Sequence, residues 1–231
     1  MSLLLQIQTV SDNLTNPEIK EKTLSVIDLI TSGGIGGNLV MGALGILSIF
    51  AIYILIERFS AIKKASKEDE NFLRSIQNFV EAKDIEAAKK LCRNTDSPIS
   101  RMIEKGVNRI NKPMTDISAA IENQGKLEVF KMENNLANLA TISGAAPMIG
   151  FLGTVIGMIV AFHEMASAGG NIDVEMLSKG IYTAMTTTVA GLIVGIIAFI
   201  AYNYLVSKVD KVVFMLEAKT TDFLDLLHHN E

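Results

Sequence analysis

Three long stretches of the sequence contain no charged residue, and no other feature constrains the fold as strongly. They cover residues 29–56, 134–162 and 180–207, so each is 28 or 29 residues long. A helix needs about 20 predominantly apolar residues to cross the hydrocarbon core of a bilayer, whereas an apolar run of about 10–14 residues is more typical of a buried core helix. The sequence therefore predicts an all-α membrane protein with three transmembrane helices, rather than three buried helices of a soluble protein.

The remaining composition argues against enzyme chemistry. The 231 residues include one cysteine, Cys92, and three scattered histidines, a set without metal-ligand spacing. The sequence contains neither a nucleotide-binding loop nor a nucleophile–base motif. We therefore expect a protein that is not an enzyme, with no catalytic residues, no metal site, no cofactor and no nucleic-acid partner.

The charges beside the apolar stretches predict how the chain crosses the membrane. Lysine and arginine gather on the cytoplasmic side of membrane helices. They follow the first stretch, precede the second and follow the third, whereas the connection between the second and third has only Lys179 against Glu164, Asp173 and Glu175. This pattern predicts an N-terminus outside, a C-terminus inside and long cytoplasmic helical extensions.

The N-terminal stretch MSLLLQIQTV has no basic residues and is interrupted by Gln6 and Gln8, so we interpret it as an amphipathic segment on the membrane surface rather than a signal peptide. The predicted order is then a periplasmic or interfacial segment (1–37), transmembrane helix 1 (38–57), a cytoplasmic helical region (58–138), transmembrane helix 2 (139–163), a periplasmic loop (164–179), transmembrane helix 3 (180–206) and a cytoplasmic C-terminal helix (207–231).

Apolar residues at helical spacing predict further helices in the cytoplasmic segments. EAKDIEAAKKLCR and SPISRMIEKGVNRI each present one apolar face, and Ser97-Pro98 opens the second of these helices, which Asn111-Lys112-Pro113 ends. KLEVFKMENNLANLA is expected to continue into the second span without a break. A last apolar stripe follows the third span, and it consists of Val209, Val213, Leu216, Phe223 and Leu227.

The three spans differ in their side chains. The first is bulky and branched, which suits contact with lipid, whereas the second and third carry small residues at spacings of three and four, a pattern that lets membrane helices approach closely. These residues include Gly150, Gly153, Thr154, Gly157 and Ala161 in the second span, and Ala184, Thr188, Gly191, Gly195 and Ala198 in the third. The plain alternative to a functional stripe is tight packing, with each threonine bonded to its own helix backbone. Pro147 predicts a kink and marks a candidate hinge.

None of the three stretches contains Asp, Glu, Lys or Arg, although charged residues usually mark an ion pathway through a membrane. Either the chain moves no ion, or another chain supplies the titrating carboxylate.

Several motifs resemble the MotA/TolQ/ExbB proton-channel family. APMIGFLGTVIGMIVAF (146–162) resembles its second-span signature, and TTTVAGLIVGIIAFIAYNYL (186–205) resembles its third-span signature. ERF at 57–59, DIEAAKKLC and SPISRMIEKG are also similar to family sequences. The resemblance runs from about residue 39 to the end, in the order and three-span topology of the ExbB/TolQ branch.

This resemblance implies an ExbB-like subunit in the inner membrane of a Gram-negative bacterium. Such subunits form pentamers around two copies of an ExbD-like single-span partner, whose aspartate carries the ion. The ion flow drives a TonB-like protein that energises outer-membrane transport. The alternatives are a TolQ-like, gliding or secretion motor subunit, or a non-conducting membrane scaffold. Membrane lipids are expected partners in every case.

The resemblance also places Thr154 and Thr188 at the pore-facing threonines of the family, with the glycine and alanine stripes as the pore wall. The chain departs from many relatives in two places. Thr183 occupies a position where they carry glutamate, and Thr187 one where proton-driven relatives often carry alanine. Added hydroxyls suit Na⁺, which needs several oxygen ligands, so the transported ion is H⁺ by default and Na⁺ as the alternative.

Overall fold

The structure is a computed structural model that describes residues 34–66, 70–167 and 174–229. Most of the interfacial segment expected over 1–37, and the middle of the loop expected over 164–179, lie outside these residues. The described residues form helices only: α3 (Gly34–Ala65), α4 (Glu70–Glu81), α5 (Ile85–Asn94), α6 (Pro98–Val107), α7 (Met114–Glu133), α8 (Leu136–Ser167) and α9 (Val174–His229).

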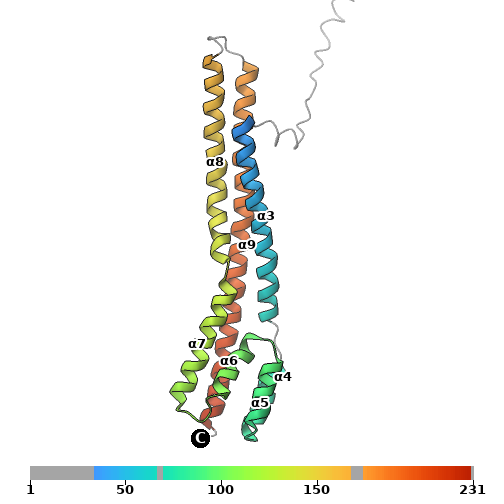
Figure 1. Cartoon of the computed structure of the whole chain (residues 1–231), viewed down its shortest axis with the longest axis vertical. Helices are drawn as coiled ribbons and strands as arrows, with labels where there is room; N and C mark the ends of the chain where they lie inside the picture. The colour runs from blue at the N-terminus through green and yellow to red at the C-terminus, as the bar shows by residue number, and fades with distance from the viewer. Residues whose placement is uncertain (1–33, 67–69, 168–173, 230–231) are drawn as a thin grey trace, which may run out of the picture.

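The long helices give the molecule an elongated shape (Figure 1). Three helical segments are long and apolar enough to cross a membrane, and they lie in α3, in α7–α8 and in α9. This confirms the predicted all-α fold with three membrane-spanning helices. The direction in which the chain crosses the membrane stays a prediction.

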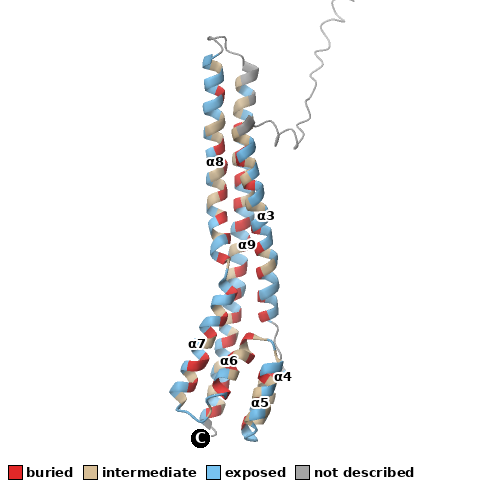
Figure 2. Cartoon of the chain, viewed as in Figure 1, coloured by how far each residue is buried: buried red, intermediate tan, exposed pale blue. Residues whose placement is uncertain are grey.

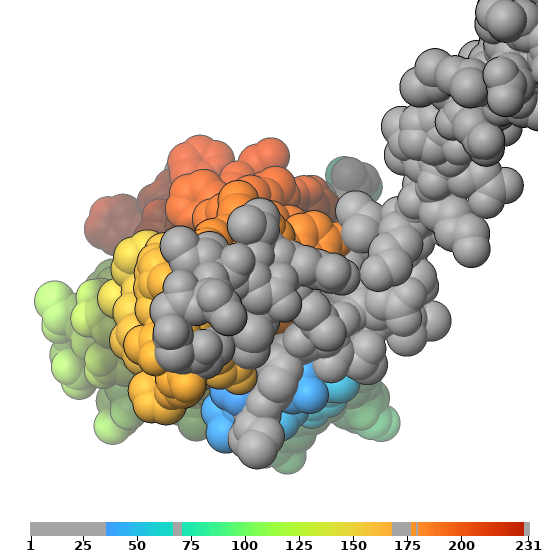
Figure 3. All heavy atoms as spheres, turned by 90° about the horizontal axis from the view of Figure 1, so that it is seen from above, coloured from blue at the N-terminus to red at the C-terminus, as the bar shows by residue number. Residues whose placement is uncertain are grey.

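The three membrane helices pack against one another at one end of the molecule. The pairing of α8 with α9 is the most extensive, and α3 contacts both. Viewed from above, the three helices appear as neighbouring patches (Figure 3). Only 22% of the most apolar window of each span is buried, so most of its surface is free to face lipid or other chains (Figure 2).

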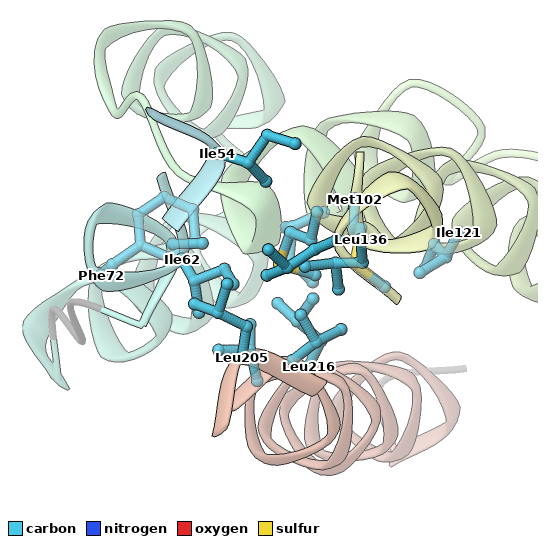
Figure 4. Packing of buried hydrophobic residues seen from close by; sticks show 14 of the residues in the cluster. Ile54, Ile62, Phe72, Met102, Ile121, Leu136, Leu205 and Leu216 are labelled. Atoms are coloured by element: carbon cyan, nitrogen blue, oxygen red, sulfur yellow. The ribbon is translucent and has the colours of Figure 1, made fainter. Parts of the chain in front are cut away.

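A second, water-facing unit lies at the other end, where α4, α6 and α7 contact the second half of α9 and α5 packs against α4 and α6 (Figure 1). Its core consists of large apolar side chains. Figure 4 shows Phe72, Met102, Ile121 and Leu216 of this core together with neighbours from the membrane helices, all pointing into the space between the helices.

Local signals explain where these shorter helices begin. Ser97 caps α6, because its hydroxyl accepts from the amide of Ser100 while the Ser100 hydroxyl accepts from the amide of Ser97, and Pro98 occupies the first helical turn. Asp84 caps α5 by accepting from the amide of Ala87. The predicted helix that begins at Ser97-Pro98 and ends before Pro113 is confirmed, and so is the helix in EAKDIEAAKKLCR.

The expectation of one unbroken helix through KLEVFKMENNLANLA is wrong. The helix α7 ends at Glu133 and α8 begins at Leu136, with a bend at Asn134 and Asn135. Asn135 has a φ of 63° in the left-handed region, where asparagine is one of the few residues found regularly. The predicted extension of the third span, in contrast, is confirmed, since α9 continues through 56 residues with Val209, Leu216 and Phe223 buried.

Candidate functional site

The backbones of α8 and α9 touch along a row of glycines. A Cβ atom on Gly150 would lie 2.7 Å from the carbonyl oxygen of Thr187, and one on Gly191 would lie 2.5 Å from that of Ala146. A Cβ atom on Gly157 would likewise lie 2.8 Å from the Cβ atom of Ala184. Contacts this short leave no room for any side chain, so only glycine fits at Gly150 and Gly191 without moving a helix.

Pro147 and Gly195 form one end of this row. The missing amide of proline leaves the carbonyl of Ser143 without its usual helical donor. A Cβ on Gly195 would lie 2.6 Å from Cγ of Pro147 and 3.0 Å from the Ser143 carbonyl oxygen. Gly195 therefore lets α9 pass directly over the proline ring, and the role of Pro147 as a hinge stays a prediction.

Thr154 of α8 and Thr188 of α9 meet in the middle of the row, where their hydroxyl groups are hydrogen-bonded to each other. The hydroxyl of Thr188 also donates to the carbonyl oxygen of Gly150 at 3.1 Å, and that of Thr154 lies 3.3 Å from the carbonyl oxygen of Ala184. The two helices thus bring hydroxyl and carbonyl oxygens together at one depth.

Thr187 is one residue further back on α9 and is 2% exposed. Its hydroxyl donates to the carbonyl oxygens of Ala184, at 2.7 Å, and Gly150, at 3.1 Å. Its side chain fills the space over Gly153, where a Cβ would lie 2.5 Å from the Thr187 hydroxyl oxygen. Thr187 is therefore packed between the helices.

Contacts with α3 separate the four threonines into two sets. Val40 of α3 lies against Gly153 of α8. A Cβ atom on Gly37 of α3 would lie 3.9 Å from the methyl carbon of Thr183. Thr183 and Thr187 are one turn apart and thus lie on the side of the pair that α3 covers. One residue is about 100° of helical rotation, which turns Thr154 and Thr188 away from α3. Both are half-buried.

The oxygens of this site come from hydroxyl and carbonyl groups. Such groups can coordinate a cation or a water molecule, but they do not exchange protons at neutral pH. A protonation step at Thr154 and Thr188 would therefore need a titrating group from another chain.

A buried carboxylate in the water-facing unit was missed by the sequence reasoning. Glu128 of α7 is 2% exposed, and its two oxygens accept from Nε and Nη2 of Arg101 at 3.0 and 2.7 Å. Lys131 adds a third bond at 2.9 Å. The available signal was its register, because Glu128 lies on the apolar face that Ile121 and Met132 define.

Two opposing effects act on the pKa of Glu128. Removal from water raises the pKa, but the hydrogen bonds and positive charges of Arg101 and Lys131 outweigh this effect and hold it below the ordinary value. Glu128 is therefore ionised at neutral pH and belongs to the structural core of the unit.

Comparison with known proteins gives a consistent result. The model of the MotA/TolQ/ExbB proton channel family matches residues 94–218, which is more than half of the chain and includes Thr154 and Thr188. A putative biopolymer transport protein, an ExbB homolog of Methanothermobacter thermautotrophicus, is 26% identical over 84% of this chain and 67% of its own length.

Two further relatives come from bacteria. The Tol-Pal system protein TolQ of Pseudomonas aeruginosa is 24% identical over 92% of this chain and 96% of its own length. The biopolymer transport protein ExbB of Helicobacter pylori is 40% identical, over 34% of this chain and 54% of its own length.

Proposed function

Because the chain belongs to the MotA/TolQ/ExbB proton channel family, we propose that it is the ExbB-like subunit of an ion-driven motor in the inner membrane of a Gram-negative bacterium. It assembles as a pentamer around an ExbD-like single-span partner, in two copies, and drives a TonB-like protein. Its family is one of channels and transport motors rather than of enzymes. Relatives named as biopolymer transport proteins support this role.

The observation that carries the proposal is the meeting of Thr154 and Thr188 on the side of the helix pair that α3 leaves open. A carboxylate of the partner must be neutralised by a proton or cation before it faces apolar surface. Hydroxyl groups beside it can hold the ion or a water molecule without titrating. Each charge that crosses about 100 mV releases roughly 2.3 kcal/mol, which is the energy available for work.

The structure supports Thr154 and Thr188 as pathway residues more than Thr183 and Thr187, because the latter pair lies on the side covered by α3. Proton transport is the first proposal. Sodium transport is the alternative, and the oxygens of Thr154, Thr188 and Gly150 would be its ligands. Motor output that is unchanged when the sodium gradient is collapsed and the proton gradient is kept supports protons, and loss of that output supports sodium.

The test uses vesicles that contain the chain with its single-span partner. Thr154→Val and Thr188→Val keep the side-chain shape and remove the hydroxyl, so each should lower ion flux about tenfold, which corresponds to about 1.4 kcal/mol. Thr186→Val is the matched control, because the Thr186 hydroxyl donates to its own helix, at Tyr182, 3.0 Å away. Unchanged flux in both pathway variants would contradict the proposal.

The match to TolQ, which covers 92% of this chain and 96% of TolQ, keeps a TolQ-like role as a second candidate. The partner decides between them, since co-purification with a TolR-like rather than an ExbD-like chain would assign the protein to the Tol system. A chain that binds neither partner and conducts no ion would instead be a membrane scaffold.

A further inference from the structure

The bend between α7 and α8 leaves a backbone group without its helical partner. In an unbroken helix the carbonyl of Lys131 would accept from the amide of Asn135, four residues later. Asn134 instead has extended dihedral angles, φ −51° and ψ 139°, and Asn135 has a φ of 63°. The chain therefore turns away from α7 at the point where this hydrogen bond would form.

Arg58 of α3 supplies the replacement donor. Its Nη1 atom donates to the carbonyl oxygen of Lys131 at 2.9 Å, across 73 positions of sequence. The side chain is 9% exposed. A buried charge is costly unless it is paired and hydrogen-bonded, so this arginine is held in place by specific partners.

The residues on both sides of Arg58 fix it in this position. Glu57 accepts from Nε of Arg58 at 3.1 Å and is also hydrogen-bonded by the side chain of Asn135, inside the bend. Phe59 stacks on Tyr204 of α9, with ring centroids 6.3 Å apart. The three residues of ERF thus connect the end of α3 to the bend on one side and to α9 on the other.

A second path of ion pairs joins the same helices. Lys64 of α3 pairs with Asp96 at 2.6 Å, Asp96 with Arg101, and Arg101 with Glu128 of α7. Glu128 in turn pairs with Lys131, whose carbonyl binds Arg58. This series of contacts begins at Lys64 and ends at Arg58, both on α3, at the level where the membrane helices end and the water-facing unit begins.

The bend has a packing consequence. Below it, α7 runs beside α9 (Figure 1) but contacts it much less extensively than α8 does, and α6 contacts both α7 and α9. Gly106 of α6 touches Ile121 of α7 and Phe223 of α9, and Met102 of α6 touches Gly125 of α7. The angle at Asn134 and Asn135 therefore determines whether α6 fits beside α7 and α9.

We propose that Arg58 is a positioning residue that latches a hinge at Asn134–Asn135, and that this latch fixes the angle between the pore helix α8 and the water-facing unit. The consequence for ion flux rests on the proposed function, because only then does α8 line a pathway. The latch itself does not depend on that function. Lysine cannot replace Arg58 fully, because a single ammonium group does not match the planar fork that binds Glu57 and the carbonyl together.

The latch can be measured as a distance in the purified full-length chain. Asn123→Cys on α7 and Met148→Cys on α8 place spin labels at two exposed positions, in a Cys92→Ala background. Labelled chain is diluted into unlabelled chain so that only distances within one chain are recorded. If the helix were straight, the two Cα atoms would be about 37 Å apart, and the bend shortens this distance.

Arg58→Gln should broaden the distance distribution, and Asn135→Ala should shift it towards the straight-helix value. Because Asn135→Ala returns the amide of residue 135 to Lys131, adding Arg58→Gln to it should cause no further broadening. Arg109→Gln is the matched control, since this exposed arginine also donates to a carbonyl of α7, that of Asp116, at 3.3 Å. The control should retain the wild-type distribution.

A wild-type distribution in Arg58→Gln would overturn the latch. If Arg58→Gln does not fold, the Asn135→Ala variant provides the test. A spin-label distance in Asn135→Ala equal to that of the wild type would overturn the hinge. With the partner present, Arg58→Gln should also lower ion flux, and Arg58→Lys should restore only part of it. Failure of the proposed function has a different signature, in which Thr154→Val leaves flux unchanged while Arg58→Gln still broadens the distances.

Discussion

The membrane helix pair and the water-facing unit are built from different contacts, although α9 belongs to both. In the pair, α9 contacts α8 through small residues, including Ala184, Gly191 and Gly195. In the water-facing unit the same helix buries Leu216 and Phe223. The size of the buried side chains increases where α9 leaves the apolar stretch.

The physical setting explains this difference. Lipid tails are as apolar as leucine, so large side chains gain little by leaving lipid for a helix interface, and close backbone contact with hydroxyl bonds holds the helices instead. In water, burial of large apolar side chains stabilises the fold by roughly 25 cal/mol per Å². One continuous helix therefore packs through small residues in the membrane and through large apolar residues in water.

The largest expected effect is at the backbone contact of the membrane pair. Gly150→Leu places a side chain where a Cβ already lies 2.7 Å from the Thr187 carbonyl oxygen, so the helices must separate. Overpacking against the backbone should cost about 3 kcal/mol. Thermal unfolding in detergent and elution on size exclusion measure the loss.

Gly144→Leu is the control on the same helix, because a Cβ there meets nothing within 4 Å. It should unfold like the wild type. Equal tolerance of both substitutions would show that backbone contact does not hold the pair.

A smaller effect is expected at the charged core of the water-facing unit. Glu128→Gln removes the charge that Arg101 and Lys131 bind. Loss of hydrogen bonds to a charged group should cost about 2 kcal/mol, a value that already allows for the partial exposure of both cations. Glu122→Gln, at an exposed pair with Lys126, is the control and should show no measurable change.

The stability of the water-facing unit should also depend on pH through Glu128. The pKa of Glu128 is lower in the folded chain than in the unfolded chain. The stability that ionised Glu128 contributes is therefore fully present above the pKa of the unfolded chain, about 4.3, and is lost as the pH falls through the pKa of the folded chain. The unit should lose stability below about pH 4.3, and Glu128→Gln should flatten that loss. A variant with the acid sensitivity of the wild type would contradict this assignment.

The smallest effect is expected at Thr187. Thr187→Val removes the bond to the Gly150 carbonyl, and interhelical hydrogen bonds in membranes average about 0.6 kcal/mol. Thr187→Ser keeps the hydroxyl and should unfold closer to the wild type than Thr187→Val does. A loss as large as that of Glu128→Gln would contradict this expectation, because polar bonds would then stabilise the membrane pair as much as they stabilise the water-facing unit.

Patterns that repeat along the chain were predictable from the sequence. The charge-free stretches predicted three membrane helices, and Ser97-Pro98 predicted the start of α6, because both signals are local. The spacing of small residues predicted which faces of α8 and α9 carry them. The role of Thr154 and Thr188 in an ion pathway stays a prediction.

Features that depend on distant parts of the chain were not predictable. Asparagine is only a weak helix breaker, so Asn134 and Asn135 gave no clear signal of a bend. The carbonyl of Lys131 finds its donor 73 positions away, at Arg58, which no local pattern reveals. Periodicity on α9 alone also did not show that α3 covers Thr187 and leaves Thr188 open.

The unbroken length of α9 makes it a mechanical lever. It carries Thr188 in the membrane and Phe223 near its far end, and Phe223 lies 35 positions after Thr188, a distance of about 52 Å along the helix. A tilt of about 5° at Thr188 would displace the helix at Phe223 by about 5 Å, which is comparable to one helical turn. A bend separates α7 from α8, whereas α9 runs through both parts of the molecule as one helix. Strain at the threonines would therefore reach the water-facing unit along α9.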